Sequence, residues 1–172
     1  MERLWAPWRM EYVSAEAQSG CIFCRARDDC EWPGVIFRGR CALVMLNAYP
    51  YNSGHLLVVP HAHVPNITDL GDDDLGYLAV LTKASVKALE RALRPAGFNV
   101  GMNIGAPAGA GIAEHVHMHI VPRWVGDTNF MTVLAETRVV PEALQACEAR
   151  LKPVFAELAK ELGLEAAKQE GS

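Results

Sequence analysis

The sequence lacks the features that mark membrane-spanning and nucleic-acid-binding chains. No run approaches the roughly 18 consecutive apolar residues that a membrane-spanning helix needs. Lysine and arginine total 16 against 20 aspartates and glutamates, which gives a formal net charge of -4. No segment gathers the basic residues that a duplex-binding face uses. We therefore expect neither a membrane nor nucleic acid as a partner.

Cysteine is also too sparse and too irregular for a disulfide framework. The five cysteines stand at positions 21, 24, 30, 41 and 147, and only Cys21 and Cys24 have an informative spacing. The first nine residues carry charges and a proline where a secretory signal would be apolar. We therefore expect a cytoplasmic protein whose cysteines are thiols or metal ligands.

Internal repeats and low-complexity stretches are absent too. A chain of 172 residues, 51% of them hydrophobic, can build one core and is short for two. We predict a single domain over 1–172 with a core at about 20–125. Before the core we expect an N-terminal arm (1–19), whose aromatic side chains must pack on the domain or on a partner chain. After it we expect a C-terminal extension (126–165) and a tail (166–172) that frays. The aromatics of the arm are Trp5, Trp8 and Tyr12.

Short apolar runs separated by turn residues predict an antiparallel sheet. Three strands are expected first, and the last of them ends at Pro60. Two more follow after a helical segment and are joined by a loop of small residues, 105–111. The five predicted strands are 35–38, 41–46, 55–59, 98–104 and 116–121. Strands followed by a helix, more strands and a second helix indicate an α+β fold with about five antiparallel strands.

Two helices are predicted. The first spans 69–94, with Thr68 or Asp69 as its cap, aspartates in its first turn and Arg91 in its last. It should cover the sheet with a face whose residues recur at steps of three and four. These residues are Leu75, Ala79, Thr82, Val86, Leu89 and Leu93. A second helix is expected after Pro141 and should end near Gly163.

Three histidines alternate with apolar residues at His115, His117 and His119. If this run is an extended strand, the three imidazoles share one face and lie roughly 6.5 to 7 Å apart. Each ring needs hydrogen-bond partners there, so the arrangement suits chemistry better than structure. Alternating histidines can bind metal, transfer protons or act as a nucleophile, and the spacing alone does not choose among these.

The neighbouring residues carry a resemblance to a known family. The string Glu114-His-Val-His-Met-His-Ile-Val-Pro-Arg123 resembles the His-φ-His-φ-His-φ-φ signature of the histidine triad (HIT) family, where φ is apolar. The segment Gly54-His-Leu-Leu-Val-Val-Pro60 is similar to a second family signature. The flanks of this core look more like the bacterial branch of diadenosine tetraphosphate phosphorylases and hydrolases. The resemblance covers roughly residues 20 to 125.

The resemblance implies a nucleotide-transferring enzyme. His117 would attack the α-phosphorus of a nucleotide and form a nucleotidyl-histidine intermediate, which water or phosphate then resolves. A hydrogen bond from its other ring nitrogen to a backbone carbonyl would fix the reactive tautomer. His119 would hold phosphate oxygens or protonate the leaving group. His55 would support these histidines, although a purely structural histidine is the alternative.

The family pattern also implies residues that bind the nucleotide. Asn47 would contact the ribose, although an asparagine before a turn can simply form that turn. Asn103 and the backbone of the 109–111 loop would hold the phosphates, because small residues let a backbone approach oxygen closely. The loop residues are Gly109, Ala110 and Gly111, and the glycines could instead serve conformation alone. The 105–113 loop has no hydroxyl side chain, which favours backbone N–H groups as the phosphate donors. Glu114 could orient a histidine or exclude a second anion.

The cysteine pair is half of a tetrahedral zinc site. The chain has no second Cys-x-x-Cys, so histidines must complete the set. In the zinc-bearing HIT branch the matching positions are His63 and His115, which with Cys21 and Cys24 make a structural zinc knuckle. His61 is the alternative ligand.

The substrate and the assembly each leave more than one possibility open. One alternative is an adenosine phosphoramidate hydrolase, which would use the same nucleophile on a different leaving group. Another is a nucleotide-binding regulatory module that binds nucleotides with little turnover. Family members are typically homodimers, so we expect a homodimer that takes adenine nucleotides. Trp124 and Phe130 pack in the core or the dimer, or shape a leaving-group pocket. Arg123 steers phosphate or forms a salt bridge.

Overall fold

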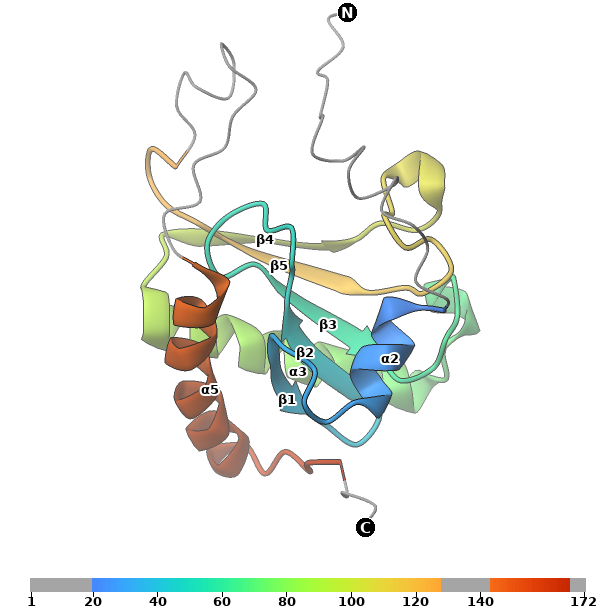
Figure 1. The fold of residues 1–172 in the computed structure, drawn as a ribbon, viewed down its shortest axis with the longest axis horizontal. Coiled ribbons are helices and arrows are strands. Elements are labelled where there is room, and N and C mark those ends of the chain that lie inside the picture. Colours follow the sequence, from blue (N-terminus) through green and yellow to red (C-terminus); the bar gives the residue numbers. More distant parts are fainter. Residues whose placement is uncertain (1–19, 128–142, 168–172) are drawn as a thin grey trace, which may run out of the picture.

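An antiparallel sheet of five strands forms the centre of the computed structural model, which describes residues 20–127 and 143–167 (Figure 1). The order across the sheet is β1-β2-β3-β5-β4. The strands are β1 (Val35–Arg38), β2 (Ala42–Leu46), β3 (Leu56–Pro60), β4 (Gly97–Met102) and β5 (Met118–Arg123). The α+β prediction and its strand number are confirmed. Trp5, Trp8, Tyr12 and Phe130 lie outside the described residues.

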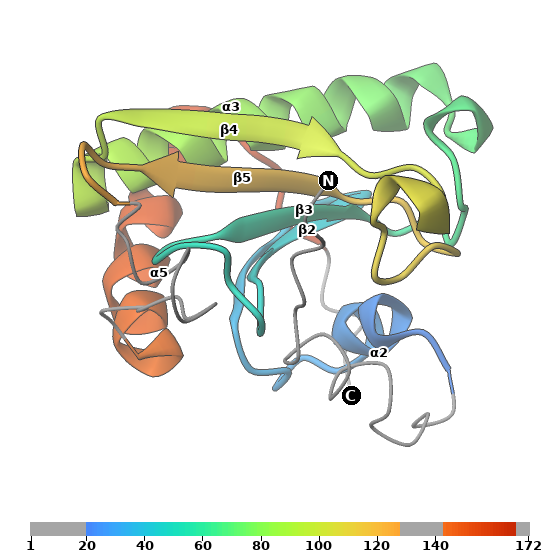
Figure 2. The ribbon, with the colours of Figure 1, turned by 90° about the horizontal axis from the view of Figure 1, so that it is seen from above.

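Within the described residues, three helices pack around this sheet. They are α2 (Ile22–Asp28), α3 (Asp72–Leu93) and α5 (Leu144–Glu161). Short 3-10 helices lie at Ile67–Asp69, just before α3, and at Ala106–Ala108, between β4 and β5. Figure 2 shows α3 on one side of the sheet and α2 on the other. None of the described helices is both long and apolar enough to cross a lipid bilayer.

The neighbouring strands β2 and β3 are buried on both faces. Alternate residues of β2 and β3, such as Val44 and Val58, pack against α3 and α5 in the main core. The intervening residues, such as Met45 and Leu57, pack against α2 in a second cluster. This explains why both strands are continuous apolar runs rather than alternating ones. The α2 face is the one that carries the candidate site.

The buried face of α3 differs from the predicted one. Of the six residues expected to cover the sheet only Leu89 is buried, while Ala79 is exposed and the other four are half-buried. The residues that the helix buries are Tyr77, Leu78, Leu81, Ala84, Ser85, Ala88 and Leu89. Small residues on this face let the helix approach the sheet closely, and the Ser85 hydroxyl donates to the Leu81 carbonyl at 2.8 Å.

The predicted start of α3 was also wrong by a few residues. Asn66 caps the preceding 3-10 helix by accepting from the Thr68 N–H at 3.2 Å. The α-helix itself begins at Asp72 after Gly71, with no side-chain cap. Three consecutive aspartates in its first turn offset the positive end of the helix dipole instead.

Candidate functional site

The three triad histidines do not share one continuous strand. β5 begins at Met118, so His115 and His117 precede it and only His119 lies in the ladder, opposite Leu57. The ladder between β3 and β5 stops at Met118, close to where β3 reaches Pro60, which has no N–H to donate. The expectation of one strand with three evenly spaced imidazoles was therefore wrong. The ring centroids of His117 and His119 are only 4.8 Å apart, whereas His115 contacts the cysteines at its Nδ1.

His117 is held in a single tautomer. Its Nδ1–H donates to the backbone carbonyl of His115 at 2.9 Å, and the side chain is 5% exposed. With the proton on Nδ1, the Nε2 of the neutral ring carries a free lone pair. Burial lowers the pKa of His117 below its ordinary value, against the opposing effect of this hydrogen bond. The ring is therefore neutral at pH 7 and has the form that a nucleophile needs.

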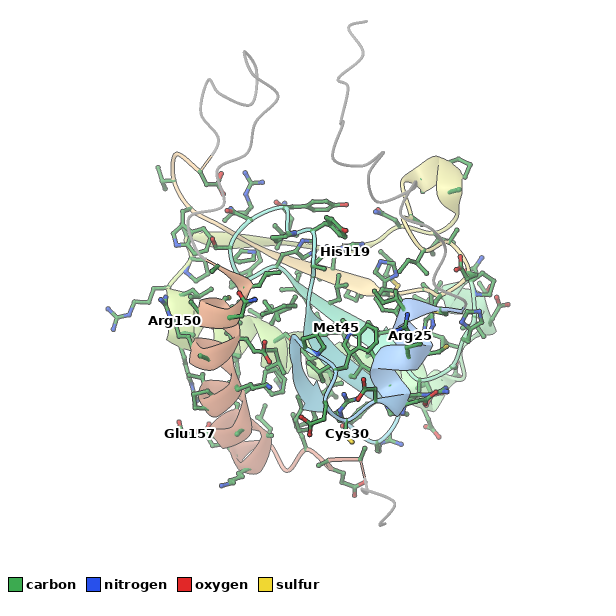
Figure 3. The ribbon with its side chains drawn as sticks, in the orientation of Figure 1. Arg25, Cys30, Met45, His119, Arg150 and Glu157 are labelled. Carbon is green, nitrogen blue, oxygen red and sulfur yellow. The ribbon has the colours of Figure 1, made fainter. Side chains whose placement is uncertain are left out.

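His119 is oriented by His55, which is completely buried. Their ring nitrogens, Nε2 of His55 and Nδ1 of His119, are 3.0 Å apart. Figure 3 labels His119 between β5 and the loop that joins β2 to β3, which precedes His55. Among the described residues the other ring nitrogen of His119, Nε2, is buried and has no hydrogen-bond partner. A buried donor without a partner is costly, so this atom is suited to a group that arrives with the substrate.

The direction of this hydrogen bond follows from the residues behind it. The backbone N–H of Tyr51 donates to His55 Nδ1 at 3.1 Å, and Asn47 Nδ2 lies 3.3 Å from the same atom. His55 Nδ1 is therefore an acceptor, and its proton sits on Nε2 and points to His119. His119 accepts on Nδ1 and carries its own proton on Nε2. Asn47 also accepts from the Tyr49 N–H at 3.0 Å, so it forms a turn as well as contacting His55.

Two aromatic side chains that no sequence motif indicated pack on these imidazoles. Phe23 lies between the two cysteines of the Cys-x-x-Cys and packs on His117 with ring centroids 4.8 Å apart. The ring of Tyr51 stacks on His119 at 5.9 Å with an angle of 14° between the planes. The available signal for Phe23 was its position inside the cysteine motif. Tyr51 had no such signal, because it falls in a stretch dense in turn residues.

Burial shapes the electrostatics of the pair. It lowers the pKa of His119 to about 4, and the neighbouring His117 contributes in the same direction. Two adjacent imidazoles in a dry site disfavour protonation of both. The resting site is therefore a neutral nucleophile beside a neutral ring that presents an N–H.

A second cluster gathers Cys21, Cys24, His63 and His115. The ligand atoms of these four residues all lie within 4.8 Å of one another. The closest pairs between a cysteine and a histidine are Cys21 Sγ to His115 Nδ1 at 3.3 Å and Cys24 Sγ to His63 Nδ1 at 3.4 Å. The Cys-x-x-Cys spans the start of α2, and His115 stands two residues before His117. His61, the alternative ligand, is not part of the cluster.

The chemistry of this cluster fits a zinc ion. The Nε2–H of His115 donates to the Pro60 carbonyl at 2.9 Å, which leaves Nδ1 free toward the thiols, as metal-binding histidines are commonly held. Burial and the neighbouring Cys21 raise the pKa of the Cys24 thiol, so two thiolates here would require a cation. Two cysteines and two histidines form a closed tetrahedral donor set.

The predicted phosphate-binding loop joins β4 to β5 at the end of the sheet where α2 lies (Figures 1 and 2). Asn103 Nδ2 donates to the Gly109 carbonyl at 3.4 Å, so it holds the loop. Gly109 has φ of +93°, a conformation that favours glycine. Ala110 is half-buried and Gly111 exposed. Glu114 is exposed and makes no hydrogen bond to a described histidine.

Arg123 forms a salt bridge at the end of β5. Its guanidinium donates to both carboxylate oxygens of Asp127, at 2.6 and 2.7 Å, and to Asn99 at 2.9 Å. Asp127 also accepts from Asn52, in the loop before His55, and from the backbone N–H of Trp124. This network ties the end of β5 to β4 and to the loop between β2 and β3.

Comparisons with known proteins identify the family of this chain. Residues 34–125 match the model of the HIT domain, and the chain belongs to the HIT family. A relative from Mycobacterium tuberculosis, an "AP-4-A phosphorylase", is 38% identical over 84% of this chain and 80% of its own length. A bis(5'-nucleosyl)-tetraphosphatase (asymmetrical) from Schizosaccharomyces pombe is 28% identical over 70% of this chain and 63% of its own length.

Solved structures show the same fold. A zinc-bound histidine triad family protein from Mycobacterium smegmatis superposes with a TM-score of 0.68 at 26% identity. The match covers 83% of this chain and 97% of that one. A hypothetical histidine triad nucleotide-binding protein from Sulfolobus tokodaii gives a TM-score of 0.69, also at 26% identity, with the same two coverages.

Proposed function

We propose that this chain is an enzyme that cleaves dinucleoside polyphosphates, such as diadenosine tetraphosphate, through a covalent nucleotidyl-His117 intermediate. The observation that carries the proposal is a pair of neighbouring imidazoles, one buried and one half-buried, of which one presents a lone pair and the other an N–H. His117 offers a bare Nε2 because its Nδ1 is tied to the His115 carbonyl, and His119 offers an N–H because its Nδ1 accepts from His55. A nucleophile beside a hydrogen-bond donor that can stabilise the leaving oxygen is an arrangement suited to group transfer.

The two steps follow from these atoms. The lone pair of His117 Nε2 forms a bond to the α-phosphorus, and the bond from that phosphorus to the leaving polyphosphate oxygen breaks. The electron pair leaves with this oxygen, whose negative charge the Nε2–H of His119 stabilises by donating a hydrogen bond. Water or inorganic phosphate then attacks the nucleotidyl group, and His117 leaves as a neutral imidazole. Asn103 and the backbone of the 109–111 loop would bind the phosphates, and Asn47 the ribose.

The substrate class is supported by the relatives. One is named for phosphorolysis of AP-4-A and another for hydrolysis of nucleosyl tetraphosphates. The relative named for phosphorolysis is more similar to this chain, which favours phosphate over water as the acceptor.

We further propose that Cys21, Cys24, His63 and His115 hold a structural zinc ion. When bound, zinc would supply cross-linking between α2 and the segment that leads into β5. His115 would then be fixed from both sides, by the cluster at Nδ1 and by Pro60 at Nε2. Because His117 donates to the His115 carbonyl, this fixed residue also sets the position of the nucleophile.

A cytoplasmic homodimer is part of the same proposal. β4 is an edge strand of the sheet, and Val100 on it is 48% exposed, which suits contact with a second copy. A monomeric mass by size-exclusion chromatography with light scattering, at high protein concentration, would contradict the dimer. The thiol-rich cluster is suited to a reducing compartment.

Turnover of diadenosine tetraphosphate by the zinc-loaded protein, with and without inorganic phosphate, tests the function. ADP plus ATP formed only with phosphate would identify a phosphorylase, and AMP plus ATP without phosphate a hydrolase. If neither pair forms while an adenosine phosphoramidate is cleaved, the substrate class is wrong. If no substrate is turned over, the chain is a nucleotide-binding module.

A further inference from the structure

We propose that Tyr51 is a positioning residue, whose ring holds His119 in the plane from which its Nε2–H reaches the leaving group. The inference deepens the proposed function and rests on it for the identity of the substrate. Tyr51 contacts His55 and His119 through its ring, and its backbone N–H donates to His55. It acts through these two histidines.

The first support is that Tyr51 contacts both members of the His55–His119 hydrogen bond. Its ring centroid is 4.8 Å from that of His55 and 5.9 Å from that of His119. The two imidazoles are themselves joined at 3.0 Å. The phenol ring therefore covers this hydrogen bond, and water that competes for His119 Nδ1 is excluded from that side.

The second support is the angle between the rings. The planes of Tyr51 and His119 differ by only 14°, which is a stacked arrangement. A ring held at one nitrogen, as His119 is by His55, can still tilt about that hydrogen bond. A second ring that lies nearly parallel to it, with centroids 5.9 Å apart, restricts this tilt, which is the movement that would turn Nε2 away from the reacting phosphate.

The third support is that the backbone of Tyr51 sets the direction of the hydrogen bond between His55 and His119. The Tyr51 N–H donates to His55 Nδ1 at 3.1 Å and so leaves the proton of His55 on the nitrogen facing His119. One residue thus fixes the tautomer through its main chain and the ring plane through its side chain. Gly54 makes the loop possible, because its φ of +74° brings the chain back to His55 four residues after Tyr51.

The test compares Tyr51→Phe, which keeps the ring, with Tyr51→Leu and Tyr51→Met, which remove it. Tyr49→Leu, at a neighbouring tyrosine that is 50% exposed, is the matched control. Steady-state kinetics on diadenosine tetraphosphate give kcat and KM. Nitrogen-15 NMR of the imidazoles reports the state of each histidine without any substrate.

We expect Tyr51→Phe and Tyr49→Leu to stay within about 3-fold of the wild-type kcat. Tyr51→Leu and Tyr51→Met should lower kcat by about 10- to 100-fold with little change in KM, because small misplacements of a reacting group have effects of this order. In the folded variants the nitrogen signals of His119 and His55 should move, while those of His115 and His117 stay in place.

Three outcomes would overturn the inference. An equal loss in Tyr51→Phe would show that the hydroxyl acts rather than the ring. A fall in kcat with unchanged His119 signals, or a shift of all four histidines together, would show that Tyr51 does not act through His119. If the wild-type protein does not cleave dinucleoside polyphosphates, the proposed function fails, and the NMR comparison still decides whether Tyr51 holds His119.

Discussion

The metal cluster and the reaction centre use neighbouring histidines in opposite ways. His115 gives its Nε2–H to the Pro60 carbonyl and turns Nδ1 to the thiols, whereas His117 gives its Nδ1–H to the His115 carbonyl and keeps Nε2 free. His119 accepts on Nδ1 and presents an N–H. A histidine in this segment thus serves as a metal ligand, a nucleophile or a hydrogen-bond donor, depending on which of its ring nitrogens already forms a hydrogen bond within the fold.

The largest effect should come from the reaction centre. His117→Ala removes the atom that would form the bond to phosphorus, so we expect a loss in kcat/KM on the order of 10⁴-fold or more, with zinc content unchanged. Steady-state assays and metal analysis check both. His61→Ala is the control, because His61 belongs to neither region. Activity close to wild type in His117→Ala would break the assignment of roles.

The metal cluster should give a smaller loss of activity and a larger loss of stability. Cys24→Ser removes one ligand of the tetrahedral set, and we expect lost zinc, a melting temperature lower by roughly 10 °C, and about a 10-fold fall in activity. Metal analysis and calorimetry measure these changes. Cys30→Ser, an exposed cysteine outside the cluster, should behave as wild type. Retention of zinc in Cys24→Ser would contradict the ligand set.

The pH dependence of stability distinguishes the half-buried His119, whose pKa is lowered, from a solvated histidine. Its folded-state pKa of about 4 lies below the ordinary value of 6.5, because burial disfavours the charged ring. The unfolded chain then binds more protons, so the stabilisation is complete above about pH 6.5 and is lost as the pH falls through about 4. Thermal melts from pH 7 to 4 should show a smaller decrease for His119→Asn than for wild type. Parallel curves for the two proteins would be inconsistent with a buried neutral ring.

The smallest effect should come from the network outside both regions. Asp127→Asn weakens a carboxylate that accepts from Arg123, Asn52 and the Trp124 N–H, and we expect destabilisation of about 1 to 2 kcal/mol, or roughly 2 to 8 °C. Calorimetry measures the shift. Glu161→Gln, in the exposed pair with Arg91, should change the melting temperature less. A greater shift for Glu161→Gln would contradict this ranking.

The sequence predicted the sheet and the histidine cluster better than the packing around them. The strands were found because β2 and β3 are short apolar runs bounded by turn residues. The face of α3 was missed because apolar residues lie on most sides of that helix, and only contact with the sheet selects Ser85 and Ala88 over Val86. Periodicity cannot distinguish faces that are similarly apolar.

Within the site, the residue types were predictable and their partners were not. The alternation of the triad suggested one shared face, but the ladder stops at Met118 and His115 turns to the cysteines instead. The choice between His61 and His63 as the ligand depends on the path of the chain after β3. The local sequence does not predict this path. Phe23 contacts His117 and Tyr51 contacts His119 across long separations in the chain. No local pattern in the sequence predicts which rings these two side chains contact.

The most direct test of the account is to trap the covalent intermediate and locate it. Wild-type protein mixed with radiolabelled diadenosine tetraphosphate is quenched within milliseconds, kept at alkaline pH to preserve the phosphorus–nitrogen bond, and digested for mass spectrometry. The account predicts one adenylyl group per active site, on His117 alone, with formation at least as fast as turnover. A label on His119 or His115, or turnover with no label at any time, would contradict it.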